Sequence, residues 1–541
     1  RGTTRTAAEN ALAILRDTEP ELHLRSVTLT AKDKICLCET RECTPEACPY
    51  ANGYYARIKS ALWDVLDVPC LTAETLQEYA ERHTVCPFEL GLDSSLWSDV
   101  IIGDYNYLFD PVVHLVRFFE SAGDYIFLVD EAHNLPGRAR EMHSAALTKT
   151  SFYEAKKLLG KGKSSLKNAL TKVNDVFIEW RHRAEEETAA RDGRFGKTFF
   201  LKERSEEFDH LLNRLCEPLE AWLDDHREPD ETHTALLQLY FDVRAWLRVA
   251  DTFDDHFVLQ ITASGSEVRA AQLCLDPSAF LADSFALGRA AVLFSATLAP
   301  ASYYKDLCGV PEARAVALRS PFPAGNQGLF CIGNVSTRYK DRDASLAIVE
   351  ESLATMVRAR CGNYLAFFPS YAYMEQAYAQ FKEHCPEINC IKQENAMDEQ
   401  QKAAFLAQFV PGPSQTLLGF AVMGGVFGEG VDLTGDRLIG VGIVGPGLPQ
   451  VGPRQEQLRD YFEQTRGSGF DYAYRYPGMN KVLQAAGRVI RTPRDKGVVL
   501  LIDNRFAMPD YRRLMPPHWS HLKMIYDTEK LERELWRFWE E

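Results

Sequence analysis

Two adjacent carboxylates, Asp130 and Glu131, stand directly after the short apolar run 126–129. Hydrolysis of a nucleoside triphosphate needs one carboxylate that holds Mg²⁺ through its waters and a second group that orients the attacking water. Both groups must project from a strand end beside the phosphates, and Asp130 and Glu131 suit these two roles respectively. The alternative is an acidic pair at a strand end that only faces solvent.

Two further polar segments follow apolar runs elsewhere in the chain. Ser295-Ala-Thr297 follows one such run, and a glycine-rich segment that contains Gly430 and Asp432 follows the run 416–422. In parallel α/β sheets, chemistry gathers at the carboxyl ends of the strands. The sequence therefore predicts that all these polar groups stand at strand ends, where a site can form.

A pair of arginines is the most specific signal in the chain. The segment Gln484-Ala-Ala-Gly487-Arg488-Val-Ile-Arg491 spaces two guanidinium groups three residues apart, which predicts one shared helical face, and Gly487 allows close approach. Guanidinium groups are planar and always charged, so the pair suits the transition state of a γ-phosphate in an arginine-finger role. An isolated arginine pair on a solvated helix is the alternative interpretation.

Six of the 13 cysteines lie close together, at Cys36, Cys38, Cys43, Cys48, Cys70 and Cys86. In an intracellular chain such a group indicates metal binding before disulfides. The spacing Cys36-x₆-Cys43-x₄-Cys48-x₃₇-Cys86 lacks the two tight pairs that structural zinc prefers, whereas an iron–sulfur cluster tolerates uneven spacing and needs four thiolates. Both Cys48 and Cys86 precede proline, as in ferredoxin ligation. The residues favour iron–sulfur over zinc, Cys38 competes with Cys36 as a ligand, and Cys70 is interpreted as a core thiol.

These residues must be positioned by alternating strands and helices. Short apolar runs recur at 100–102, 126–129, 290–294, 364–368, 416–422, 438–444 and 498–502. Runs that are buried on both faces and separated by helical stretches, such as 344–359 and 374–384, predict parallel sheets of the α/β class.

Two segments interrupt this alternation. The charged segment from 141 to about 264 predicts a mainly helical insertion between two strands of one sheet, and 451–477 predicts a second insertion. The last stretch, 527–541, predicts a helix that docks through one apolar face formed by Leu531, Leu535 and Phe538.

Composition and charge exclude several classes of protein. The chain has 541 residues, 46% hydrophobic and 25% charged, so it can bury large cores and is neither disordered nor a small disulfide scaffold. Its net charge of −15 excludes a generally basic nucleic-acid binder and leaves only local basic or aromatic grooves for such binding. No apolar run approaches the ~18 to 20 residues of a membrane span, so we expect a soluble intracellular protein with no membrane partner.

The order of the chemical elements resembles a known family. Asp130-Glu-Ala-His133, Ser295-Ala-Thr297, Gly428-Glu-Gly430-Val-Asp432 and Gln484-Ala-Ala-Gly-Arg488-Val-Ile-Arg491 resemble motifs II, III, V and VI of superfamily 2 helicases. With the upstream cysteines and the stretch 101–111, the chain is similar to the iron–sulfur branch that contains XPD and the bacterial DinG-like helicases.

The resemblance implies an α/β fold with two RecA-like parallel-sheet motor domains, and an Fe–S domain and a helical arch inserted in the first. The implied boundaries are 1–30, 98–140 and 266–300 for the first motor domain, 31–97 for the Fe–S domain, 141–265 for the arch and 301–541 for the second motor domain.

The resemblance also implies a role for each site residue. Glu131, Arg488 and Arg491 are catalytic; Asp130 (with Mg²⁺), Gln484, Gly430 and Asp432 bind the nucleotide; His133, Ser295 and Thr297 couple nucleotide state to domain closure; Cys36, Cys43, Cys48 and Cys86 hold a 4Fe–4S cluster. Tyr105 and Asn106 are candidate DNA contacts, and Tyr105, Tyr107 and Phe109 could stack on bases, although alternate aromatics are as often core. The basic stretches 161–167 and 191–202 of the arch are candidates to track phosphates.

The implied activity is that of a monomeric, ATP-dependent DNA helicase that moves 5′ to 3′ on single-stranded DNA and unwinds forked DNA. Such a protein is expected in the bacterial cytoplasm, associated with the nucleoid.

One family element has no match in these residues. The phosphate loop G-x-x-x-x-G-K-[ST] is absent, and the first residues resemble the end of motif Ia, so we expect an amino-terminal truncation and little ATP hydrolysis by this stretch alone. The alternative is a naturally short, ATPase-deficient Fe–S module that binds DNA or serves as a scaffold. A third interpretation, an Fe–S redox protein, is disfavoured by the motif V and VI residues.

The ligand assignment predicts that Cys43→Ser loses iron and labile sulfide because one of four thiolates is removed. The matched variant Cys38→Ser is expected to retain both, as measured by iron and sulfide analysis of the purified proteins. Full retention in Cys43→Ser together with loss in Cys38→Ser would show that the assignment is wrong.

Overall fold

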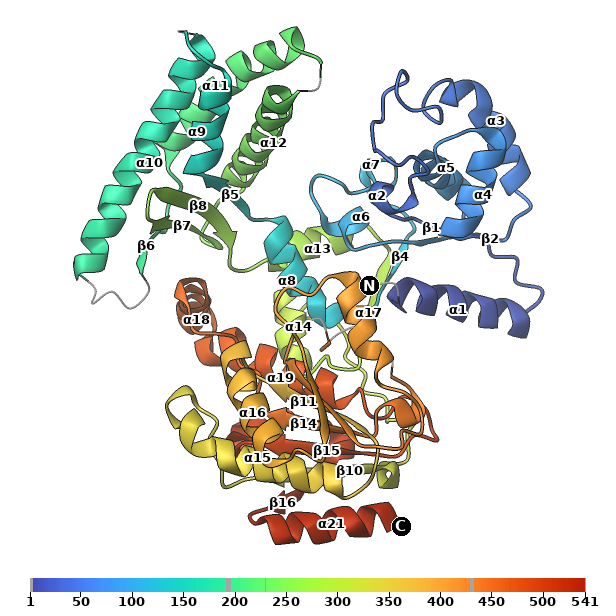
Figure 1. Ribbon diagram of the computed structural model, residues 1–541. Coiled ribbons are helices and arrows are strands. Elements are labelled where there is room, and N and C mark those ends of the chain that lie inside the picture. The colour runs from blue at the N-terminus through green and yellow to red at the C-terminus, as the bar shows by residue number, and fades with distance from the viewer. Residues whose placement is uncertain are drawn as a thin grey trace. The chain divides into compact units, whose positions relative to one another are not determined.

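The computed structural model describes residues 3–162, 164–190, 196–228, 230–425, 427–428 and 433–540 (Figure 1). The chain divides into two compact units, unit 1 with residues 1–123 and unit 2 with residues 124–541. Within the described ranges, no helix is both long enough and apolar enough to cross a bilayer.

Unit 1 is built on a parallel sheet of order β2-β1-β3 in its described residues. The central strand β1 (Ser26–Thr28) pairs with both neighbours, and its Val27 is fully buried beneath short helices. The helix starts follow ordinary rules: the Thr72 hydroxyl accepts a hydrogen bond from the Thr75 amide, and Pro87 occupies a first turn. The remaining elements are α1 (Thr3–Thr18), α2 (Lys32–Ile35), α3 (Tyr54–Val65), β2 (Cys70–Leu71), α4 (Ala73–His83), α5 (Pro87–Ser94), β3 (Val100–Ile102), α6 (Asn106–Phe109) and α7 (Val116–Phe119).

Unit 2 begins with a strand pair that joins distant parts of the chain. β4 (Ile126–Val129) runs parallel to β9 (Ala290–Leu293), with Val129 opposite Leu293. The prediction of burial on both faces is wrong for this pair, because Ile126 and Leu128 are 64% and 68% exposed. Their register partners Ala290 and Val292 on β9 are exposed as well.

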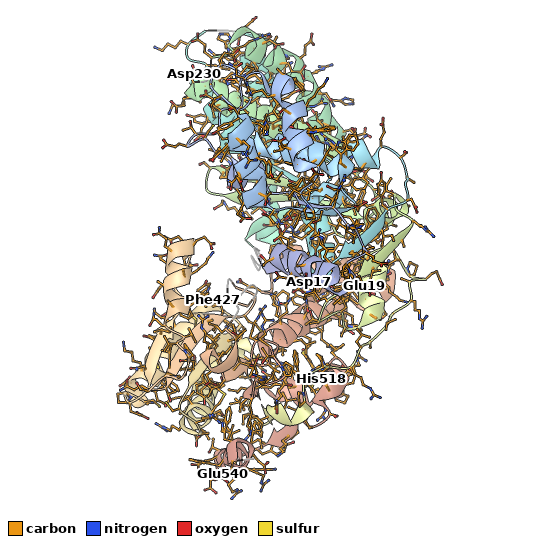
Figure 2. The ribbon with its side chains drawn as sticks, turned by 90° about the vertical axis from the view of Figure 1, so that its right-hand side faces the viewer. Asp17, Glu19, Asp230, Phe427, His518 and Glu540 are labelled. Atoms are coloured by element: carbon orange, nitrogen blue, oxygen red, sulfur yellow. The ribbon has the colours of Figure 1, made fainter. Side chains whose placement is uncertain are left out.

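The segment between β4 and β9 forms an insertion, called the arch below. Its helices predominate, as predicted, but they cover an antiparallel sheet of order β5-β8-β7-β6 that the sequence analysis did not predict. Asp230, labelled in Figure 2, begins α12 by accepting a hydrogen bond from the His233 amide at 2.6 Å. The elements are α8 (Leu135–Met142), β5 (Ala145–Thr148), α9 (Lys149–Leu158), α10 (Ser165–Ala190), β6 (Lys197–Leu201), α11 (Glu206–Asp225), α12 (Glu231–Asp251), β7 (Phe257–Ser264), β8 (Glu267–Cys274) and α13 (Ser278–Ala286).

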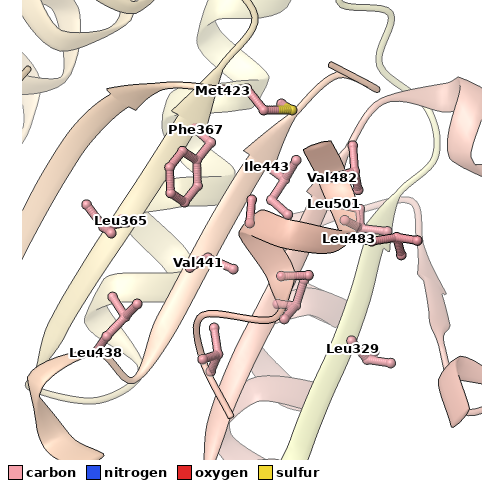
Figure 3. Close-up of a cluster of buried hydrophobic side chains, with 14 of the residues drawn as sticks. Leu329, Leu365, Phe367, Met423, Leu438, Val441, Ile443, Val482, Leu483 and Leu501 are labelled. Carbon is pink, nitrogen blue, oxygen red and sulfur yellow. The ribbon is translucent and has the colours of Figure 1, made fainter. Parts of the chain in front are cut away.

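The C-terminal part of unit 2 is built on a wholly parallel sheet of order β12-β13-β11-β14-β15-β10-β16 in the described residues. In β11 (Asn363–Phe368), Leu365 and Phe367 point into the cluster shown in Figure 3, while Tyr364 and Phe368 point into a second cluster on the other face. All four side chains are fully buried, which explains why this strand reads as a continuous apolar run.

Helices cover both faces of this sheet, and the predicted strands and helices are found with shifts of a few residues. The last helix, α21, docks through the fully buried Leu531 and Leu535, which confirms the predicted face. The elements are α14 (Ala301–Leu307), β10 (Gln327–Ile332), α15 (Arg342–Arg358), α16 (Tyr371–His384), β12 (Asn389–Lys392), α17 (Glu399–Ala407), β13 (Leu417–Val422), β14 (Gly440–Val444), α18 (Pro453–Arg466), the π-helix η6 (Asp471–Arg475), α19 (Tyr476–Ala486), β15 (Gly497–Ile502), α20 (Pro509–Arg512), β16 (Lys523–Ile525) and α21 (Thr528–Glu540).

Asp503, fully buried just after β15, is the main polar anchor of this sheet. Its carboxylate accepts hydrogen bonds from Arg505 Nε at 2.7 Å and Nη2 at 2.8 Å, and from the Thr337 amide at 3.0 Å. Burial raises the pKa of Asp503, but hydrogen bonds from Arg505 and Thr337 outweigh it and hold the pKa below its ordinary value. The Asp503 carboxylate therefore stabilises the fold fully at pH values above the pKa of an aspartate in the unfolded chain. This stabilisation is lost as the pH falls through the lower pKa of Asp503 in the folded chain.

Asp503→Ala is expected to cost about 3–5 kcal/mol, because it leaves the guanidinium of Arg505 buried without its counter-charge. Urea unfolding followed by tryptophan fluorescence, to which the buried Trp519 of this part contributes, measures this change. The control is Arg537→Ala, which removes an exposed ion pair with Glu534 and should cost less than about 1 kcal/mol. Equal shifts in the two variants would contradict the anchoring role of Asp503.

Candidate functional site

The turn after β4 presents the acidic pair. Asp130 Oδ1 accepts a hydrogen bond from the Glu131 amide at 2.7 Å, and Glu131 has a φ of 47°, a left-handed conformation that few residues with a Cβ adopt. Such strain persists only where surrounding contacts impose it, and it is common at functional sites. The turn is therefore a built feature that fixes the direction of both carboxylates.

A buried imidazole connects this turn to two other parts of unit 2. His133 Nδ1 lies 2.7 Å from Ser295 Oγ and 3.2 Å from Glu131 Oε2, and the Gln484 amide nitrogen on α19 contacts His133 Nε2. The Ser295 hydroxyl donates to Glu131 Oε2 at 3.2 Å, and Thr297 N donates to Ser295 Oγ at 3.2 Å. One assignment satisfies every group: a neutral imidazole whose Nδ1–H donates and whose Nε2 accepts from Gln484.

The two carboxylates differ in their electrostatic surroundings. The hydrogen bond from His133, aided by Ser295 and the charge of Arg488, lowers the pKa of Glu131 against the opposing effect of burial. Burial raises the pKa of Asp130, and the neighbouring charge of Glu131 adds to this effect. Glu131 is thus held as an anion that can accept a proton or a hydrogen bond from water. The ionised form of Asp130 would be stabilised by a nearby cation.

The arginine pair departs from its prediction. α19 ends at Ala486, so Arg488 and Arg491 do not share a helical face. Beyond the helix end, the amides of Arg488 and Val489 make turn bonds to the Ala485 and Ala486 carbonyls, and the amides of Arg491 and Thr492 donate to the Asp495 carboxylate, each at 2.7 Å. Arg488 still reaches the site: its Nη2 donates to the Gly428 carbonyl at 3.0 Å and its charge acts on Glu131.

Two predicted nucleotide contacts, Gly430 and Asp432, lie outside the described residues. The loop before them is held by Gln393, whose Oε1 accepts from the Val422 amide at 2.9 Å and whose Nε2 donates to Tyr371 at 2.6 Å. The sequence analysis missed Gln393 and Asp495. Only Asp495 carried a signal, as a turn-forming acid within four residues of Arg491.

The cysteine group lies within unit 1 on loops next to short helices. Cys38 Sγ is 3.9 Å from Cys48 Sγ, Cys43 is exposed, and Cys86 precedes α5. Burial raises the pKa of Cys86, although the Glu89 and Phe88 amides at the helix start favour its thiolate. In the described part of the chain, no three His, Cys, Asp or Glu side chains gather closely enough to hold a metal ion.

The donor chemistry is nevertheless that of a thiolate-ligated cluster, because unit 1 holds Cys36, Cys38, Cys43, Cys48 and Cys86 as free thiols. Lys32 interacts electrostatically with Cys43 and Cys86, and Cys38 interacts with both Cys36 and Cys48. Neither Cys36 nor Cys38 is excluded as a ligand by this arrangement.

The candidate DNA contacts separate into exposed and buried groups. Phe109 is only 4% exposed and packs edge-on against Tyr105 with ring centroids 6.2 Å apart, so it is a core residue. Tyr105 and Asn106 remain partly accessible at the start of α6. In the arch, Lys167 donates to the carbonyls of its own loop and Lys197 pairs with Glu185 at 2.7 Å, while residues 191–195 lie outside the described part.

Comparisons with known proteins agree with this arrangement. A family described as DEAD_2 matches residues 19–152, and a helicase C-terminal domain matches residues 353–522. The XPD helicase subunit of general transcription and DNA repair factor IIH from Schizosaccharomyces pombe is 25% identical over 82% of this chain and 67% of its own length. Regulator of telomere elongation helicase 1 from Rattus norvegicus is 22% identical over 92% of this chain, which spans 45% of that relative.

A solved XPD helicase structure superposes with a TM-score of 0.59 over 95% of this chain and 89% of its own chain, at 18% identity. The fold is therefore the α/β fold of these structures, with two RecA-like domains and insertions. More particularly, the two matched domain families and the relatives make this chain similar to XPD-like DEAD_2 helicases.

Removing the Gln484 amide tests the imidazole contact. Gln484→Ala leaves His133 Nε2 buried without a hydrogen-bond donor, which costs about 1–3 kcal/mol of stability. Amide hydrogen exchange in residues 130–142 is therefore expected to become roughly 5- to 150-fold faster. Exchange followed by mass spectrometry measures the effect, and the exposed Gln400→Ala is the control. Unchanged exchange in Gln484→Ala would show that this contact does not stabilise residues 130–142.

Proposed function

We propose that this chain is the motor part of an ATP-dependent DNA helicase of the bacterial DinG-like branch, which moves 5′ to 3′ along single-stranded DNA and unwinds forked DNA as a monomer. The observation that carries the proposal is the contact of His133 with both Ser295 and Gln484, because three elements far apart in sequence meet at one group. The relatives support it, since both are named helicases, one of them in a DNA repair factor.

In this proposal each residue of the site has one task. Asp130 holds Mg²⁺, Glu131 orients the attacking water, and Gln484, Arg488 and Arg491 act on the phosphates from the C-terminal part. His133, Ser295 and Thr297 transmit the nucleotide state, and Gly430 with Asp432 connects the DNA path to the nucleotide. The low pKa of Glu131 supports its role, because the residue must be ionised at neutral pH to accept from water.

The cysteine group completes the proposal for unit 1. Cys36, Cys43, Cys48 and Cys86 would hold a 4Fe–4S cluster, which when bound supplies a rigid covalent crosslink between their loops. Tyr105 and Asn106 would lie along the single strand.

The activity test is DNA-stimulated ATP hydrolysis by the natural gene product. Glu131→Gln is expected to lower the stimulated rate at least about 100-fold, because it removes the group that orients and deprotonates water. Glu399→Gln, whose side chain is 91% exposed on α17, should leave the rate unchanged.

The 541 residues assayed alone separate the two candidate functions. We expect single-stranded DNA binding with little ATP hydrolysis, because these residues hold no phosphate loop. A strong Glu131-dependent rate from this stretch would contradict that expectation. A gene product that binds DNA but hydrolyses no ATP would support the ATPase-deficient module instead.

A further inference from the structure

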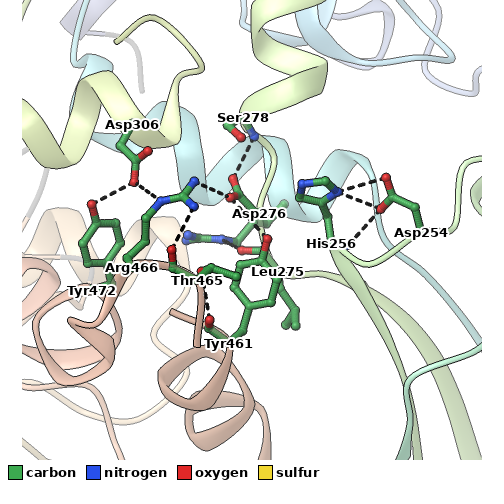
Figure 4. A network of polar contacts seen from close by, with 11 residues as sticks. Asp254, His256, Leu275, Asp276, Ser278, Asp306, Tyr461, Thr465, Arg466 and Tyr472 are labelled. Carbon is green, nitrogen blue, oxygen red and sulfur yellow. Dashed lines mark hydrogen bonds and ion pairs between the residues drawn. The ribbon is translucent and has the colours of Figure 1, made fainter. Parts of the chain in front are cut away.

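Three arginines, Arg140, Arg269 and Arg454, lie near enough to interact electrostatically where the arch joins the C-terminal part of unit 2. Arg140, on α8, donates from Nε to the Leu275 carbonyl at 2.8 Å and stacks over the Phe462 ring at 5.7 Å. Figure 4 shows this junction, with Leu275 beside Asp276 and the α18 residues Tyr461 and Arg466. Arg140 is therefore fixed between the arch and α18.

The strand register places Arg269 at the same junction. In β8, Ala271 and Leu273 pack in one apolar cluster with Leu458 and Phe462 of α18. Because side chains alternate along a strand, Arg269 shares their face of the sheet, opposite Thr148 of β5.

Helix geometry brings in the third arginine from α18. Arg454 lies one turn before Leu458, so both residues are on the side of α18 that meets the arch sheet. Arg454, at the start of this helix, and Arg269 are both exposed, so the group can be reached from solvent.

The group carries an excess of positive charge. Burial lowers the pKa of Arg454, and the charges of Arg140 and Arg269 lower it further against the opposing effect of Glu141. Across the described ranges, neither Arg269 nor Arg454 makes a side-chain hydrogen bond or an ion pair.

The nearest acids are already engaged elsewhere. Glu141 pairs with Arg138 at 3.3 Å, and Asp276 accepts from the Ser278 amide at 3.0 Å and from Arg466 at 3.4 Å. The arginine group therefore lacks a full counter-charge, which is unusual in a chain with a net charge of −15.

We propose that Arg140, Arg269 and Arg454 form an anion site that binds a backbone phosphate of single-stranded DNA. The inference rests on the proposed function, because a helicase supplies this ligand. Planar guanidinium groups bind phosphate oxygens in pairs, and a phosphate would offset the mutual repulsion of the three cations. At this site the arch sheet, α18 and α8, the helix that directly follows His133, would all contact the same phosphate of the single-stranded DNA.

The test compares Arg269→Gln/Arg454→Gln with the full chain in fluorescence anisotropy on a labelled oligothymidine, between 50 and 200 mM salt. One lost contact to a single-strand phosphate should make the plot of log affinity against log salt shallower by about 0.7. We expect that change or more, with roughly 5- to 10-fold weaker binding at the lowest salt. The control is Arg459→Gln on the same helix, because Arg459 is already paired with Glu456 and Asp460.

A lysine pair, Arg269→Lys/Arg454→Lys, guards against misfolding because it keeps both charges. The lysine variant should recover most of the wild-type salt dependence. If Arg269→Gln/Arg454→Gln has a lower melting temperature than Arg459→Gln, its DNA binding is compared with that of the lysine variant. Wild-type slope and affinity in the glutamine pair, with folding intact, would overturn the inference.

Calorimetry with inorganic phosphate alone distinguishes the source of the ligand. Phosphate binding that is lost in the glutamine pair while DNA binding is unchanged would make this a free-phosphate site and overturn the DNA assignment. If the wild-type chain binds no single-stranded DNA, the proposed function fails as well. Weaker DNA binding by Arg269→Gln/Arg454→Gln, together with normal DNA binding by Arg459→Gln, supports the site.

Discussion

Unit 2 depends on one buried imidazole, His133, whose two ring nitrogens are satisfied by different parts of the chain. Nδ1 meets Ser295 beyond β9, and Nε2 meets Gln484 on α19. A neutral imidazole has one donor and one acceptor, so its ring position is correct only when both partners are in place. The parallel register of Val129 with Leu293 sets the two turns at the same level. The position of Glu131 follows from this, because Ser295 and His133 both hold its carboxylate.

A second junction ties the arch to the C-terminal part of unit 2. Leu273 of the arch sheet and Tyr303 of α14 share an apolar cluster with Phe462 of α18. Arg466 adds polar contacts to Asp306 at 2.8 Å and to the buried Asp276 at 3.4 Å. Because breaking a buried ion pair leaves an uncompensated charge, this junction resists separation. Motion that begins at the turn of Glu131 and His133 must therefore either carry α18 and the arch together or loosen this contact.

Much of the fold followed from apolar periodicity, which reports burial directly. The strands of the C-terminal sheet and the docked face of α21 were predicted because runs such as 364–368 are buried on both sides. The antiparallel sheet of the arch was missed, since long charged helices around it dominate the local pattern. The exposed face of β4 was also missed, because Ile126 and Leu128 look the same in sequence whether or not anything covers them.

The sequence by itself determined which residue types stand at strand ends and in what order, because covalent order and side-chain chemistry are local properties. Only the tertiary structure decided which of them meet. Arg488 and Arg491 are spaced for one helical face, yet α19 ends at Ala486 and the Arg491 amide bonds to Asp495 instead. Phe109 is spaced like a stacking group, yet it is buried in the core. In each case burial or a satisfied hydrogen bond outweighs the preference predicted from spacing, because these contribute more free energy than intrinsic propensity does.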